Sequence, residues 1–125
     1  MVSFEIIKWP LKLTPMNKDI IEEGKVPAII SYITIFGVII AFFMNSDKKN
    51  SFAYFHIRQS LGLWLTFFAI GLVVSNFDSW FATLAFYLFF GILFIYSFMT
   101  AVAGRTDPTP LVGNFYQKLF AGLGN

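Results

Sequence analysis

The sequence predicts an all-α membrane protein with three transmembrane helices, a short N-terminal helix and a C-terminal interfacial amphipathic helix. Three long apolar stretches predict the spans, namely Val26 to Met44, Phe52 to Val74 and Trp80 to Ala103. The first and third contain 19 and 24 residues without a charged side chain, and about 20 apolar helical residues cross a hydrocarbon core of about 30 Å. Composition agrees with this class, because 57% of the 125 residues are hydrophobic and only 13% are charged.

The polar segments on either side of the spans predict one transmembrane domain, residues 26–104, between two tails. In the N-terminal tail, residues 1–25, Thr14 and Pro15 are a typical N-cap and first-turn pair. They predict a short helix that ends before Gly24, since glycine is the commonest residue just after a helix.

Two short polar turns, residues 45–51 and 75–79, separate the three predicted spans. Connections of this length make consecutive helices antiparallel neighbours. Trp80 follows the second turn directly, and its amphipathic ring is expected to anchor the third span at the membrane interface.

The C-terminal segment, residues 105–125, is predicted to lie in the interface. From Leu111 onward apolar residues recur at helical spacing, opposite Asn114, Gln117 and Lys118. A helix of about 13 residues is too short to cross the hydrocarbon core. We therefore expect Phe115 and Leu119 to act as interfacial anchors.

Positive charge predicts the orientation. In a three-span arrangement the first turn and the C-terminal segment share one side, and the N-terminal tail and the second turn share the other. Lysine and arginine favour the cytoplasmic side of membrane proteins, and the first of these sides carries five of them against four on the second. The sequence thus predicts that the first turn and the C-terminus are cytoplasmic.

A polar cluster of Phe55, His56, Arg58 and Gln59 opens the second span. An arginine at the centre of a membrane costs about 3 kcal/mol, whereas one near the interface can extend its charge to the headgroups. Three roles are open: interfacial anchoring, hydrogen bonding to a neighbouring helix or a partner, and catalysis or proton relay. The third role needs a second ionisable group, and the spans contain no carboxylate.

Several classes of function are disfavoured by the residues that the chain lacks. The chain has no cysteine and a single histidine, so we expect neither a metal nor another cofactor. It also has no acid and base pair in the spans and no glycine-rich phosphate loop, which predicts a protein that is not an enzyme. Its lysines and arginines form no dense block, which argues against a nucleic-acid partner.

A family resemblance rests on the residues from Glu22 to Leu65, which read EEGKVPAIISYITIFGVIIAFFMNSDKKNSFAYFHIRQSLGLWL. An apolar span, a short turn of Asp and Lys, and then Phe-His-x-Arg-Gln resemble the small bacterial membrane proteins related to the chloroplast inner-envelope protein-import component, the Tic-twenty-like family. Gly104 and the later run from Pro110 to Gly113 are similar to its ending, so the resemblance covers about residues 22–113. It implies the bacterial inner membrane and a link to protein translocation, although the chloroplast relatives have four spans.

These observations together predict a small non-enzymatic membrane protein, which acts as an accessory or assembly subunit of a larger membrane complex. Its partners would be the lipid bilayer and that complex. The alternative is an oligomeric pore or carrier component. Three helices enclose no aqueous path by themselves, so this alternative requires a homo-oligomer.

Overall fold

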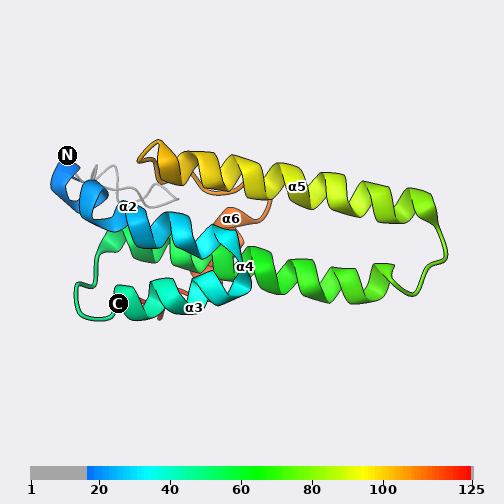
Figure 1. Cartoon of the computed structure of the whole chain (residues 1–125), viewed down its shortest axis with the longest axis horizontal. Helices are drawn as coiled ribbons and strands as arrows, with labels where there is room; N and C mark the ends of the chain where they lie inside the picture. The colour runs from blue at the N-terminus through cyan, green and yellow to red at the C-terminus, as the bar shows by residue number, and fades with distance from the viewer. Residues whose placement is uncertain (1–16, 125) are drawn as a thin grey trace.

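The computed structural model describes residues 17–124, and every regular element in that range is a helix. The helices in chain order are α2 (Lys18–Ile33), α3 (Ile35–Met44), α4 (Ser51–Val74), α5 (Trp80–Val102) and α6 (Gly113–Leu119). Figure 1 shows α4 and α5 as a long antiparallel pair, with α2 and α3 beside the first half of α4. The predicted all-α fold is therefore confirmed for the described range.

Two helices, α4 and α5, are long and apolar enough to cross a membrane. They contain 24 and 23 residues, or about 35 Å each at 1.5 Å per residue. A side chain just before each helix caps it: Asn50 Oδ1 accepts the Ala53 N–H at 3.0 Å, and Ser79 Oγ accepts the Ala82 N–H at 3.1 Å. These helices coincide with the second and third stretches predicted to be spans.

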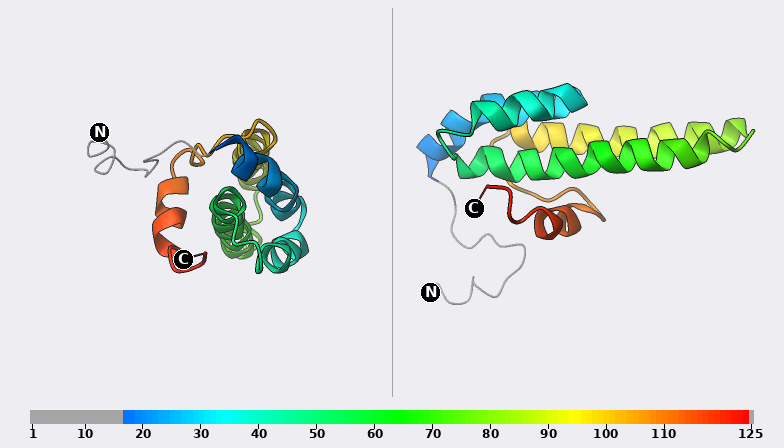
Figure 2. Two further views of the ribbon diagram at one scale, coloured as in Figure 1. Left: turned by 90° about the vertical axis from the view of Figure 1, so that its left-hand side faces the viewer. Right: turned by 90° about the horizontal axis from the view of Figure 1, so that it is seen from below.

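The first predicted span, Val26 to Met44, is not a single helix. The chain breaks at Thr34, whose backbone is extended at φ −153° and ψ 171° and whose hydroxyl oxygen caps α3 by accepting the Gly37 N–H at 3.0 Å. After this break α3 runs back alongside α2, so the two helices form an antiparallel hairpin (Figures 1 and 2). Consequently three spans are not found, and both ends of this hairpin lie at the same end of the molecule.

Gly37 allows the hairpin to close tightly. A Cβ at this position would overlap the carbonyl oxygen of Ile30 in the last turn of α2. The hairpin is also short. From Val26 to the end of α2 there are 8 apolar or small residues and α3 has 10, which at 1.5 Å per residue corresponds to about 12 and 15 Å. These lengths are about half of a hydrocarbon core of about 30 Å.

The N-terminal boundary of the hairpin also differs from the prediction. The predicted cap Thr14 lies outside the described residues. Within them, Asn17 caps α2 by accepting the Asp19 N–H at 2.8 Å. The helix does not end at Gly24, because it continues through that residue and Pro27 to Ile33. Gly24 instead lets α2 approach α4, since a Cβ there would overlap the Asn50 side chain.

The helix α6 has 7 residues, fewer than predicted, and lies across α4 (Figure 2). Tyr116 packs its ring against Gly62 and shares a 2.7 Å hydrogen bond with the hydroxyl of Thr66. Gln117, predicted on the outer polar face, is buried against α4 instead. The polar side of this short helix can face inward because α4 supplies hydrogen-bond partners for it.

As a result, the two ends of the molecule along its long axis differ. The wide half is the end that contains α2, α3, α6 and the adjoining parts of α4 and α5. Among the described residues, the narrow half, residues 67–90, consists of the remainder of α4 and α5 with their connecting loop (Figure 1).

Candidate functional site

The cluster predicted from the sequence lies within the wide half. His56 and Gln59 are both fully buried, one turn apart on the face of α4 that meets α2. The start of α4 is fixed by Asn50, whose Nδ2 donates to the Ile20 carbonyl of α2 at 2.8 Å. Asn45 reinforces this end, because its side chain bonds the backbone N–H and carbonyl of Asn50 at 3.0 Å each.

A directed chain of hydrogen bonds joins α4 to α2 and to the segment after α5. The Gln59 amide donates from Nε2 to the Tyr32 hydroxyl at 2.9 Å, and that hydroxyl is 2.7 Å from His56 Nδ1. At its ends, His56 Nε2 bonds the Arg105 carbonyl at 2.8 Å, and Gln59 Oε1 accepts the Thr109 N–H at 2.7 Å. We refer to Tyr32, His56 and Gln59 as the clasp, and to residues 105–109 as the strap.

The partners determine the position of each proton. The Arg105 carbonyl can only accept, so Nε2 of His56 carries a hydrogen. The Gln59 amide nitrogen can only donate, so the Tyr32 oxygen accepts that bond and its own proton points to Nδ1 of His56. The imidazole is therefore neutral in this arrangement, which suits a residue that has no exposed surface.

The strap is held further by α5. The Ser97 and Thr109 hydroxyls share a 2.6 Å hydrogen bond, and both residues are buried. Arg105 pairs with Asp107 within the strap. Gly113, the first residue of α6, passes so close to Gln59 that a Cβ would lie 2.9 Å from its Oε1. The strap is thus bonded to both α4 and α5.

Arg58 lies on the other side of α4 and holds α6. Its Nε donates to Gln117 Oε1 at 2.8 Å and its guanidinium NH1 donates to the Leu123 carbonyl at 2.8 Å. Gln117 completes the contact by donating to the Phe55 carbonyl at 2.9 Å. Of the roles open for Arg58, its contacts are those of hydrogen bonding to a neighbouring segment, since two of its donors have acceptors within the chain.

Aromatic rings surround the imidazole. The ring centroids of Phe52, Phe55 and Tyr32 lie 4.8, 5.0 and 5.6 Å from that of His56, each in an edge-on arrangement. The Phe55 side chain therefore belongs to the wall around His56. This wall separates the imidazole from solvent and favours its neutral form.

The clasp has little capacity left for a ligand. Among residues 17–124, no buried side-chain nitrogen or oxygen is without a hydrogen-bond partner. Within the same range, no three histidine, cysteine or acidic residues are placed to hold a metal ion. The arrangement is suited to fixing α2, the strap and α6 on α4.

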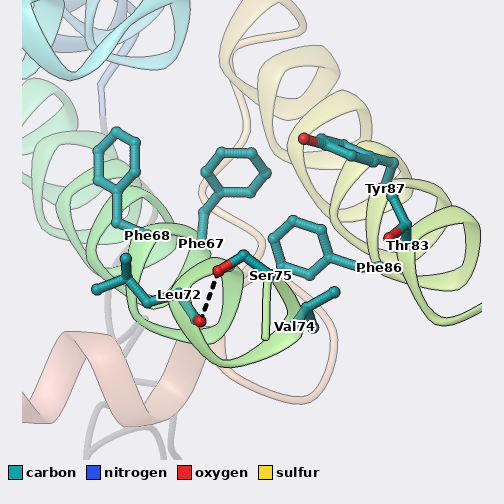
Figure 3. Close-up of a pocket in the computed structure, with 9 residues that line it drawn as sticks. Phe67, Phe68, Leu72, Val74, Ser75, Thr83, Phe86 and Tyr87 are labelled. Carbon is teal, nitrogen blue, oxygen red and sulfur yellow. Dashed lines mark hydrogen bonds between the residues drawn. The ribbon is translucent and has the colours of Figure 1, made fainter. Parts of the chain in front are cut away.

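A separate apolar cleft of about 350 Å³ opens between α4 and α5 in the narrow half (Figure 3). Phe67, Phe86 and Tyr87 form much of its wall. The hydroxyls of Ser75 and Thr83 bond their own helices, Ser75 to the Leu72 carbonyl at 2.8 Å and Thr83 to the Ser79 carbonyl at 3.3 Å. Ligand sites usually combine apolar walls with a few convergent polar groups, and these hydroxyls do not converge.

The three predicted anchors lie on the outside of the molecule. Trp80 is 77% exposed at the start of α5, far from the clasp, and Phe115 and Leu119 are 59% and 57% exposed on the outer side of α6. Sequence reasoning missed Tyr32, Thr109 and the Asn45–Asn50 pair. Tyr32 could have been noticed as a phenolic residue inside an apolar stretch. Its partners His56 and Gln59 could not have been assigned, because they lie 24 and 27 residues away in the sequence.

Comparisons with known proteins give no relative: no family model, curated protein or solved structure matches the chain.

Proposed function

We propose that this chain is a non-enzymatic integral membrane protein of the bacterial inner membrane, which acts as an accessory or assembly subunit of a larger membrane complex. In this proposal α4 and α5 cross the bilayer, and the α2–α3 hairpin enters the hydrocarbon core to about half its depth and returns. The resemblance of the Phe55 to Gln59 motif to the Tic-twenty-like family adds protein translocation as the process that the complex would serve.

One observation carries the membrane assignment: several polar side chains are fully buried, while many large apolar side chains are exposed. The fully buried residues include His56, Gln59 and Ser97, whereas Leu72 and Phe81 are 71% and 74% exposed. Soluble proteins rarely leave broad contiguous apolar surfaces in contact with water. In lipid the same distribution is stable, because buried polar groups need internal partners and apolar side chains do not.

Charge supports one orientation of the proposed spans. Asp78, in the loop of the narrow half, is the only charged residue between Arg58 and Arg105. All lysines and arginines of residues 17–124 therefore belong to segments at the wide half. The proposal puts the wide half on the cytoplasmic side, with α2 beginning there as well.

The subunit role is supported by how the polar cluster is used. Its donors and acceptors hold the chain's own helices and strap together, so the cluster has a structural role. The outward faces of α3, α4 and α5 carry large apolar and aromatic side chains, which is the kind of surface on which membrane helices pack.

Two measurements test the proposal. First, membranes that contain the chain are washed with alkaline carbonate, which strips peripheral proteins. We expect the chain to remain with the membranes, and its complete release would contradict the membrane assignment.

Second, the chain is purified from its native membrane in mild detergent and examined by native mass spectrometry. A stoichiometric larger membrane protein is the expected result, a homo-oligomer would favour the pore or carrier, and a lone monomer would contradict both.

A further inference from the structure

The number of helices in cross-section changes along the molecule. In the wide half α2 packs against α3, α4 and α5, and α6 packs against α4, whereas the described residues of the narrow half belong to α4, α5 and their connecting loop (Figures 1 and 2). The molecule therefore has the shape of a wedge along the axis of its two long helices. The following argument rests on the proposed membrane insertion of these helices.

The difference in cross-section is large for a small protein. A helix with its side chains is about 10–12 Å in diameter, so each of α2 and α3 adds roughly 80–110 Å² of cross-section. The hairpin thus roughly doubles the area that the chain takes in one leaflet relative to the other, before α6 is counted. Its apolar part ends at about half the depth of the core, so the added area belongs to one leaflet only.

The outer surface of the hairpin is suited to lipid. Ile39, Ile40 and Phe43 on α3 are exposed, and Phe36 near the tip is 70% exposed. Within α3 no residue is charged. The extra cross-section therefore displaces acyl chains, rather than standing in water beside the bilayer.

The wedge is also held rigidly. The clasp fixes Tyr32, close to the tip of the hairpin, to α4. Trp64 Nε1 donates to the Ser31 carbonyl at 3.3 Å, and Asn50 fixes the other end of α2. Flattening the shape would break several buried hydrogen bonds and leave their groups without partners in lipid.

We infer that the chain responds to membrane curvature, and that its preferred partner is a bilayer whose wide-half leaflet is convex. A convex leaflet offers more area per lipid at its surface, so it accommodates the added cross-section with less compression than a flat leaflet. A concave leaflet does the opposite. Insertion of apolar area into one leaflet is known to depend on curvature for amphipathic helices, and here the hairpin supplies that area.

The test uses the full chain in giant vesicles of phosphatidylcholine, a neutral lipid that removes attraction between lysines and anionic headgroups. A dye on Gly122→Cys marks the wide half, since the chain has no other cysteine and Gly122 has open space around it. Narrow tubes are pulled from the vesicles, and dye density in the tube is compared with that in the vesicle. A membrane-impermeant quencher then removes the signal of molecules whose wide half faces outward, which separates the two orientations.

Molecules with the wide half outward should have a tube-to-vesicle density ratio above one that rises as the tube narrows. Those with the wide half inward should have a ratio below one. Equal ratios for both orientations, or the reverse order, would overturn the inference. A double variant, Tyr32→Phe with Gln59→Leu, loosens the hairpin without removing its apolar area and should bring both ratios closer to one. If the chain instead washes off the vesicles, the membrane proposal fails before curvature is tested.

Discussion

Gln59 explains why a fully polar amide is found within an apolar helix. One side chain connects three segments, because its Nε2 donates to Tyr32 of α2 and its Oε1 accepts from the strap at Thr109. A backbone N–H at Thr109 would otherwise be buried without an acceptor. In lipid such a group has no water to replace its partner, so the amide has a structural role that no apolar side chain can take over.

Replacing Gln59 with leucine should lower the stability of the chain in detergent by about 1–3 kcal/mol, the cost of leaving a buried donor unpaired. The measurement is thermal or denaturant unfolding in one detergent. Ser75→Ala is the matched control, because that hydroxyl is exposed and bonds only the Leu72 carbonyl of its own helix. A Gln59→Leu variant as stable as this control would show that the clasp contributes nothing.

Arg58→Lys separates the geometry of the guanidinium from its charge. The lysine keeps the cation, but a single ammonium on a flexible stem cannot reproduce the two donors that reach Gln117 and Leu123. We expect α6 to loosen, at a cost of about 1–3 kcal/mol. Hydrogen exchange should accelerate in residues 113–123 and stay unchanged in α5. If protection of α6 is unaffected, headgroup anchoring by any cation is sufficient.

At the scale of elements, the hairpin is the part of the fold that composition does not predict. The 19 residues from Val26 to Met44 satisfy every criterion for a span, and length and hydropathy carry no information about a turn within them. The turn depends on Thr34 and Gly37 together, one as a cap and the other as a site of close backbone approach. The sequence signal for this turn was a threonine three residues before a glycine. That pattern is too common in membrane helices to predict a turn by itself.

The two long helices and the motif that opens α4 were predictable for different reasons. Long, mostly apolar runs with Asn50 and Ser79 before them specify α4 and α5 locally. The position of the polar cluster was also readable, since buried polar residues in a span need partners. Its partners were not readable, because Tyr32 and Thr109 meet α4 only after the hairpin and the strap have folded onto it.

A pair of glycine variants tests how α6 is docked. Gly62→Ala places a methyl group into the ring of Tyr116 and should displace α6, which speeds proteolysis of the C-terminal segment. Gly91→Ala has open space around it and should stabilise α5 by about 0.5–1 kcal/mol through its higher helix propensity. The two identical changes should therefore shift the unfolding temperature in opposite directions. Equal shifts would mean that α6 does not rest on Gly62.

At the scale of the whole molecule, the hairpin changes the count of positive charge. In a three-span arrangement the lysines of α2 lie opposite those of the loop after α3, and the two sides nearly balance. With α2 and α3 as a hairpin, Lys18, Lys25, Lys48 and Lys49 lie at the same end. The loop of the narrow half has Asp78 as its only charged residue. Under the proposed membrane insertion, a weak preference in orientation becomes a strong one.

Single cysteines distinguish the two topologies, since the natural chain contains none. We expect Lys18→Cys, Ser46→Cys and Gly122→Cys to resist a membrane-impermeant thiol reagent in intact cells and to react after the membrane is opened. Asp78→Cys should react in intact cells. The position at Lys18 decides between the arrangements, because three spans would put it on the same side as Asp78, whereas the hairpin puts it with Ser46. Labelling of Lys18→Cys from outside, with Ser46→Cys protected, would mean that the hairpin opens into a span in the membrane, and labelling of Ser46→Cys from outside would reverse the orientation.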